Sequence, residues 1–359
     1  MLPDINMNPY LLESTIPFWT VIGLSMVLMY QLAPIGKKID LVDTPDSRKR
    51  HKNPVPLVGG ISISVAIFLS VMLVPFGLTT FRYLFFSLGV LVVIGVLDDH
   101  QDVSARTKIV MQFAVALILV LGDGLVVTNI GDVFSWDDGN SQGLSWIGQP
   151  LTILAIVGVI NALNMSDGHD GTASAVFLLT VGSLILLCSF SESWKYQYIL
   201  ALFFLSVAVH FCFNFVFGKK HQIFLGDAGS MVLGLVVVYA LINLSEGEVP
   251  ALKTVCAPWI FGLPLLDMFA VISLRLIQKK SPFLADRQHI HHVLMDRNYS
   301  RTKVLLIIVF IHTLFCTVGV VGTLFNVPDW VLFWPIFPIF VAYFLLLYRH
   351  ANGVKNRIA

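Results

Sequence analysis

The sequence predicts an all-α polytopic integral membrane protein with about eleven transmembrane helices. Of its 359 residues, 56% are hydrophobic and only 13% are charged, and the mean hydropathy is +0.81. These values lie far from those of soluble domains. Apolar stretches recur along the chain, and each is long enough for a helix of about 20 residues or for a shorter, buried one. We therefore expect a single membrane-embedded domain over residues 1–359.

The expected spans follow one another with short connections. Nine of them contain no charged residue: 14–36, 54–81, 83–97, 109–122, 139–166, 171–191, 196–218, 228–245 and 330–348. The stretch 304–328, which contains His312, is another without Asp, Glu, Lys or Arg, and 254–274 carries one acid, Asp267. No Lys or Arg precedes Lys37, so the first stretch lacks the basic start of a cleaved signal peptide and should remain as a span.

The distribution of Lys and Arg predicts the orientation in the membrane. With eleven spans the loops alternate between two sides, and one side holds 20 of the 23 Lys and Arg residues. The other side holds three of them against ten acids, a net charge of −7. By the positive-inside rule the basic side is cytoplasmic, so the N-terminus lies outside and the C-terminus inside. The polar motifs described next were not used in this assignment, and all fall on the cytoplasmic side.

The first motif is an acidic cluster at the end of an apolar run. Asp98, Asp99 and Asp102 share one face if the helix continues. Clustered carboxylates repel one another unless a cation or a proton intervenes, and oxygen ligands favour Mg²⁺ or Mn²⁺. The alternative is a polar helix end with Arg106 and Lys108 as counter-ions.

Two further motifs end or begin a span. In NALNMSDGHDG (161–171) amides and acids recur every three residues, which suits a metal, a sugar or a base, or else a helix cap. In FLGDAGS (224–230) Asp227 stands among small residues that let a phosphate approach, or is a simple N-cap. Phe224 stacks on a nucleobase or anchors the chain at the interface.

The fourth motif, DRQHIHH (286–292), combines Arg with three histidines. Zinc remains open, but the spacing is unusual for a structural zinc site, and phosphate binding fits the neighbouring basic loop better. Within the adjacent span, Asp267 supports the floor of a site or pairs with another helix, and Pro264 predicts a kink. His312, alone in an apolar span, is expected to pack in the core.

Together, acids suited to a hard cation, basic and histidine loops, and a membrane scaffold indicate a reaction between a cytoplasmic polyphosphate and a lipid. Two other classes of protein stay open. An ion-coupled transporter would place its ionisable residues near the bilayer midplane, where this sequence puts only Asp267. A non-catalytic assembly protein would keep the fold without the activity.

Five motifs in order make the chain resemble the polyprenyl-phosphate N-acetylhexosamine-1-phosphate transferases over nearly its whole length. They are DxPxxRKxH at 43–51, DDxxD at 98–102, NxxNxxDGxDG at 161–171, GDxGS at 226–230 and HxHH at 289–292. In the spacing of these histidines the chain resembles the branch of the family that joins UDP-GlcNAc to undecaprenyl phosphate. Members of the peptidoglycan branch carry consecutive histidines instead. Ser166 and His169 depart from the pattern, since relatives carry apolar residues there.

The resemblance implies roles for individual residues. It implies that four residues are catalytic: Asp98, Asp99, Asp102 and Lys108. It also implies that Asp227 and Asn164 bind Mg²⁺, or Mn²⁺ as a substitute. It assigns the nucleotide sugar to Asn161, Asp167, Asp170, Asn214 and Phe224, and phosphates to Arg287, His289, His291 and His292. It implies that the lipid phosphate binds to a basic loop that contains Arg48, Lys49 and His51.

The activity implied by the resemblance is transfer of GlcNAc-1-phosphate from UDP-GlcNAc to undecaprenyl phosphate, with release of UMP. This is the first membrane step of O-antigen or enterobacterial common antigen synthesis in the bacterial inner membrane. The same chemistry with another UDP-N-acetylhexosamine or with UDP-MurNAc-pentapeptide is the nearest alternative. The expected partners are the two substrates and the lipid bilayer. A second copy of the chain, in a homodimer, is a further expected partner. No nucleic acid is expected to bind.

Overall fold

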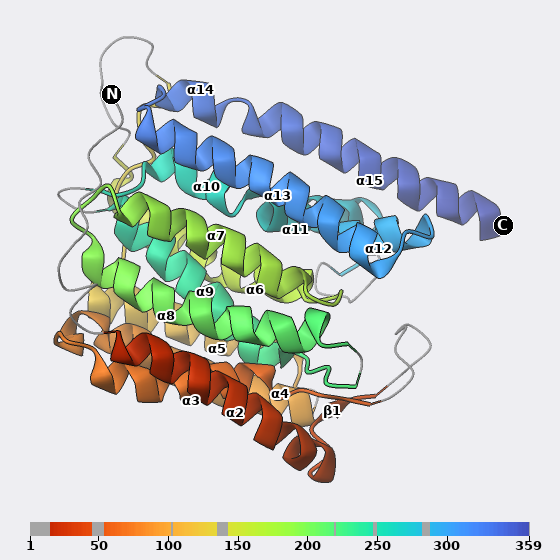
Figure 1. Ribbon diagram of the computed structural model, residues 1–359. Coiled ribbons are helices and arrows are strands. Elements are labelled where there is room, and N and C mark those ends of the chain that lie inside the picture. The colour runs from red at the N-terminus through yellow and green to blue at the C-terminus, as the bar shows by residue number, and fades with distance from the viewer. Residues whose placement is uncertain are drawn as a thin grey trace.

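The computed structural model describes residues 15–44, 54–101, 103–134, 143–218, 220–246, 250–281 and 288–358. These residues form a bundle of helices (Figure 1). The α-helices are α2 (Ile16–Lys38), α3 (Gly59–Ser70), α4 (Arg82–Gln101), α5 (Ala105–Leu117), α6 (Gly148–Ser166), α7 (Thr172–Cys188), α8 (Trp194–Phe211), α9 (Gly226–Ser245), α10 (Ala257–Ile260), α11 (Gly262–Ile277), α12 (Ile290–Asp296), α13 (Arg301–Leu324), α14 (Asp329–Phe333) and α15 (Ile336–Ile358).

Shorter elements extend or connect these helices. Short helical segments are η1 (Val71–Leu73), η2 (Leu78–Phe81), η3 (Ile118–Asp123), η4 (Ser145–Ile147), η5 (Cys212–Val216) and η6 (Thr254–Cys256). Of these, η3 and η5 are π-helical and continue α5 and α8. The sheet consists of β1 (Val42–Asp43) and β2 (Val55–Pro56), which pair antiparallel.

The predicted all-α membrane class is confirmed. Eight helices of the described chain are long and apolar enough to cross a membrane, and the bent pair Thr254–Ile260 and Gly262–Ile277 makes a ninth. Two further apolar helices, Gly59–Leu73 and Thr172–Cys188, are shorter. Each of the eleven predicted stretches therefore coincides with a helix, although two of these helices fall short of full spanning length.

The central helix of the bundle is α9, which packs against α3, α4, α6 and α7. It is apolar on every side, the pattern of a helix enclosed by others, and nearly all of its residues are buried. Small residues let its neighbours approach closely. A Cβ on Gly60 of α3 would lie 2.1 Å from the backbone nitrogen of Gly229, and one on Gly95 of α4 would lie 2.2 Å from Cα of Ala228.

The kink predicted from Pro264 is present. The segment ending at Ile260 and the helix beginning at Gly262 are inclined by 77°. Pro264 has no N–H to give to the carbonyl of Ile260, four residues earlier. That carbonyl instead accepts from the Thr180 hydroxyl at 3.4 Å. The prediction that His312 packs in the core is also confirmed, because it is fully buried, with Nε2 3.0 Å from the same hydroxyl.

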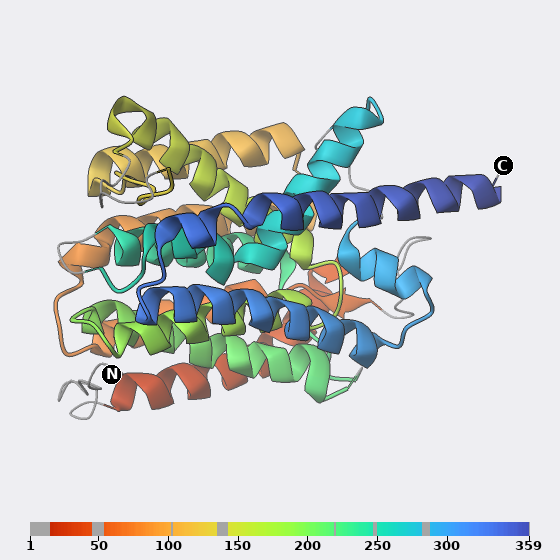
Figure 2. The same ribbon diagram turned by 90° about the horizontal axis from the view of Figure 1, so that it is seen from above.

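The two ends of the bundle carry different elements. α2 begins at the end opposite to the one where α15 finishes, as an odd number of crossings requires (Figure 1). In Figure 2 the C-terminal part of α15 runs beyond the other helices, and α11 is inclined away from them. β1 and α12 lie at the same end as the finish of α15, which is the end that the Lys and Arg distribution assigns to the cytoplasm.

Candidate active site

The acidic pair at the end of α4 meets the beginning of α9. One oxygen of Asp99 accepts from the backbone N–H of Asp227 at 2.8 Å, and the other accepts from that of Ala228 at 3.3 Å. A carboxylate is favourable at a helix N-terminus, so α9 compensates for the unfavourable position of Asp99 at the end of α4. Gly226 makes the approach possible, since its φ is +73° and a Cβ there would lie 2.5 Å from Asp99 Oδ2.

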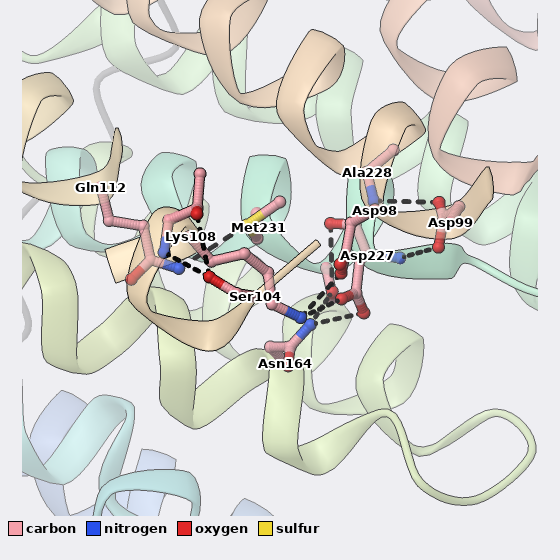
Figure 3. Close-up of polar contacts among 11 residues, drawn as sticks. Asp98, Asp99, Ser104, Lys108, Gln112, Asn164, Asp227, Ala228 and Met231 are labelled. Atoms are coloured by element: carbon pink, nitrogen blue, oxygen red, sulfur yellow. Dashed lines mark hydrogen bonds and ion pairs between the residues drawn. The ribbon is translucent and has the colours of Figure 1, made fainter. Parts of the chain in front are cut away.

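A single ammonium group joins two other carboxylates of this junction. Lys108 Nζ lies 2.7 Å from Asp98 Oδ2 and 3.0 Å from Asp227 Oδ2 (Figure 3). Lys108 stands in the first turn of α5, whose N-terminus is capped by Ser104, which accepts from Thr107 N–H at 3.2 Å. Asp98 is buried at 8% exposure, so the paired cation is what makes its charge tolerable.

The last turns of α6 carry two of the predicted amides, and one of them reaches the junction. Asn164 donates from Nδ2 to Asp227 Oδ1 at 2.9 Å and to the Ser230 hydroxyl at 2.8 Å. Its amide nitrogen rather than its oxygen therefore faces Asp227. Asn161 lies one turn earlier and donates to Gln112 Oε1 at 2.6 Å. The structure thus brings Asn164 to the carboxylates and places Asn161 deeper, between α5 and α6.

The turn after α6 holds two more predicted residues. Asp167 is half-buried, and its pKa is raised well above the usual range by burial and then by the charges of Asp227 and Asp99. Asp170 pairs with Arg301, whose Nε lies 2.9 Å from Asp170 Oδ2.

Asn214, in η5 after α8, is buried and connects two backbone segments. It accepts from Gly171 N–H at 2.5 Å and donates to the Ile223 carbonyl at 2.8 Å. Phe224, the residue after Ile223, is held through its backbone, because its N–H donates to the Pro56 carbonyl at 2.9 Å. Asn214 therefore links the turn after α6 to the segment that leads into α9.

The histidine motif forms the start of α12 and is anchored by a buried acid of α11. Asp267 Oδ2 lies 2.7 Å from His289 Nδ1, while Oδ1 accepts from Ile290 N–H at 3.0 Å and from the Tyr343 hydroxyl at 2.5 Å. Asp267 thus pairs with two other helices, α12 and α15, which is one of its two expected roles. Because Ile290 N–H is part of the first turn of α12, this acid also orients the histidines.

His291 lies beneath the turn that carries Asp167 and Asp170. It is 2% exposed, and a Cβ on Gly168 would lie 2.3 Å from its Nε2, so α12 packs directly on this turn. Burial, then the charges of His292 and His289, lowers the pKa of His291 well below its usual value, which leaves its ring neutral at pH 7. The neighbouring His292 ring centroid lies 4.2 Å away.

Several predicted residues lie outside the described part of the chain: Arg48, Lys49, His51, Asp102 and Arg287. Other residues of the site were not predicted. Ser230, Tyr343 and Arg301 contact Asn164, Asp267 and Asp170, respectively. Ser230 stands within a recognised motif, whereas Tyr343 and Arg301 lie on helices remote in sequence from their partners and carry no local signal.

Replacing Asp267 by Asn is expected to destabilise the protein by about 1–3 kcal/mol, the cost of leaving a buried polar group unsatisfied. The amide has one acceptor atom for the three donors that now surround the carboxylate. Thermal unfolding in detergent measures the effect. Asp40→Asn is the matched control, because Asp40 is exposed with φ of 60°, a conformation that Asn adopts equally well. Equal melting temperatures for both variants would contradict this role of Asp267.

Comparison with known proteins identifies a family. The family model described as glycosyl transferase family 4 matches residues 81–245, which include the α4–α9 junction. Undecaprenyl-phosphate alpha-N-acetylglucosaminyl 1-phosphate transferase of Escherichia coli strain K12 is 32% identical over 301 residues, covering 83% of this chain and 81% of that protein. The proteins of the same name from Yersinia pestis and Pasteurella multocida are 30% and 32% identical, over 86% and 88% of this chain and 84% and 87% of theirs.

Proposed function

The chain belongs to glycosyl transferase family 4, and we propose that it transfers GlcNAc-1-phosphate from UDP-GlcNAc to undecaprenyl phosphate, releasing UMP. The observation that carries the proposal is the meeting of Asp98, Lys108 and Asp227 in a chain whose relatives are named for this transfer. The reaction belongs to one domain, residues 1–359, on the cytoplasmic face of the bacterial inner membrane. The ion-coupled transporter has no support among these relatives.

Magnesium is the cofactor that the donor set suits. Asp98 and Asp227 both contact the Lys108 ammonium, so their oxygens are close enough to share a small cation. Oδ1 of Asp98 is buried and has no hydrogen-bond partner within the described residues. Mg²⁺ is typically held by one or two carboxylates together with substrate phosphates. Mg²⁺, or Mn²⁺ in its place, would neutralise charge on the diphosphate.

The two carboxylates at the end of α4 have different roles in this proposal. Both oxygens of Asp99 accept backbone N–H groups of α9, so Asp99 is a positioning residue that fixes Asp227. Asp98 has an oxygen without such a partner and is the catalytic carboxylate of the pair. Asn164 holds the Asp227 carboxylate through its amide nitrogen, which makes it a supporting residue.

The chemistry is an in-line displacement at phosphorus. An oxygen of the lipid phosphate bonds to the β-phosphorus of UDP-GlcNAc, the bond from that phosphorus to the bridging oxygen breaks, and UMP departs with that oxygen. A phosphate monoester is mostly dianionic at pH 7, because its second pKa is about 6, so no strong base is required. Lys108 supplies positive charge where the diphosphate would lie, as phosphoryl transfer demands.

The remaining predicted residues surround this centre and are proposed to bind the substrates. The nucleotide sugar is assigned to Asn161, Asp167, Asp170 and Phe224, with Asn214 fixing the turn between them. The phosphates are assigned to His289, His291 and His292 together with Arg287, and the lipid phosphate to the loop of Arg48, Lys49 and His51. We also propose that the chain can pair with a second copy of itself as a homodimer.

The donor sugar is tested by incubating the purified protein with undecaprenyl phosphate, Mg²⁺ and labelled nucleotide sugars. We expect UMP and undecaprenyl-diphosphate-GlcNAc to form from UDP-GlcNAc in equal amounts. The matched donors are UDP-GalNAc, which differs in one hydroxyl configuration, and UDP-MurNAc-pentapeptide. UMP release from one of these and none from UDP-GlcNAc would replace the proposed donor while leaving the reaction class intact.

A further inference from the structure

Arg301 contacts three separate parts of the site. Its Nε lies 2.9 Å from Asp170 Oδ2 in the turn after α6, and Nη2 donates to the Asn214 carbonyl at 2.8 Å. Its guanidinium carbon also lies 4.6 Å from the centre of the Phe215 ring, within the range of a cation–π contact. The guanidinium thus makes an ion pair, a hydrogen bond and a ring contact at once, which suits its planar, delocalised charge.

The position of Arg301 is unfavourable for its own helix. It is the first residue of α13, the first turn contains no acid, and Lys303 adds a second positive charge. Cations at a helix N-terminus are opposed by the helix dipole. The contacts with Asp170 and Phe215 offset this cost, so Arg301 serves the neighbouring segments rather than α13.

These contacts complete a connection across the site. Asn214 already joins Gly171 to Ile223 through its side chain, and Arg301 binds the carbonyl of Asn214 on one side and Asp170 on the other. The side chains of Arg301 and Asp170 are 28% and 27% exposed, so the pair lies at the surface of the site and not in the core. The turn between α6 and α7 is therefore fixed from α13.

We propose that Arg301 is a positioning residue for the nucleotide sugar, which orients Asp170 and the turn that carries it toward the nucleotide part of the donor. This rests on the proposed function, which assigns Asp170 to that substrate. Arg301 is remote from the Lys108 cluster, to which no described contact joins it, so it acts on donor binding rather than on the displacement at phosphorus.

The test compares Arg301→Ala, Arg301→Lys and Asp170→Asn in steady-state UMP release. We expect Arg301→Ala to raise KM for UDP-GlcNAc about tenfold with kcat nearly unchanged, as loss of uniform binding does. Arg301→Lys should fall between Ala and wild type, because Lys keeps the charge but not the fork. The double variant Arg301→Ala/Asp170→Asn should be no worse than the poorer single variant, since the two residues act as one unit.

Arg82→Ala is the matched control, because Arg82 is also the first residue of a helix, α4, but is exposed and lies at the opposite end of that helix from Asp98. Melting temperatures of all variants separate binding from folding. An unchanged KM in Arg301→Ala, or a loss of kcat alone, would overturn the role of Arg301. If wild-type protein releases no UMP, the proposed function fails instead, and titration of each variant with UDP still reports whether Arg301 supports nucleotide binding.

Discussion

Replacing Asp227 by Asn is expected to lower kcat for UMP release by at least about a hundredfold, the scale seen when one preorganised electrostatic group is removed from an active site. The side chain would keep an oxygen for Asn164 but lose the charge that pairs with Lys108. The backbone N–H that binds Asp99 would be unaffected, so the beginning of α9 should stay in place.

The measurement is kcat of the purified variant beside that of Glu192→Gln. Glu192 is exposed in the connection between α7 and α8 and lies outside the site, so its substitution removes the same charge without effect on the reaction. Circular dichroism and thermal unfolding check that both variants are folded. Wild-type kcat in folded Asp227→Asn would remove Asp227 from the catalytic centre.

Replacing Gly95 by Ala is expected to damage the packing of the membrane core and the active site together. The new Cβ would lie 2.2 Å from Cα and 2.4 Å from the nitrogen of Ala228, so two helix backbones would have to separate. Overpacking of a core typically costs about 1–3 kcal/mol and occasionally more. Because Asp98 follows Gly95 by one turn, separation would also displace it from Asp227, and a shift of about 1 Å can cost about a hundredfold in rate.

Gly89→Ala is the matched control on the same helix. No atom lies within 4 Å of a Cβ at Gly89, and Ala is favoured over Gly in a helix by roughly 0.5–1 kcal/mol. We expect Gly89→Ala to melt at or above the wild-type temperature with full activity, and Gly95→Ala to lose both. Equal stability and activity in the two variants would contradict the close contact between α4 and α9.

The helices were predictable from sequence because membrane insertion demands long apolar stretches, which need no knowledge of tertiary contacts. The kink at Pro264 and the burial of His312 followed from equally local rules. The central position of α9 was not predicted, although its lack of any polar face is the signal for it. The cytoplasmic location of the site stays a prediction from the Lys and Arg distribution.

The candidate site was predictable only as a set of residue types at one end of the spans. Asp98, Lys108 and Asp227 were each predicted to belong to the site, but their contacts with one another were not. Asp227 is 119 residues from Lys108, and sequence periodicity does not predict contacts between residues so far apart. The acid pair also looked equivalent in sequence. Only the geometry separates Asp99, which caps α9, from Asp98, which faces Lys108.

The most direct test of the central claim is Mg²⁺-dependent UMP release from UDP-GlcNAc and undecaprenyl phosphate by wild-type protein and by Asp98→Asn, Asp99→Asn and Asp227→Asn. The account predicts that wild type releases UMP only with the divalent cation. It also predicts that Asp98→Asn and Asp227→Asn lose the activity, while Asp99→Asn loses it through displacement of α9. Full Mg²⁺-dependent activity in all three variants would contradict the assignment of the α4–α9 junction as the active site.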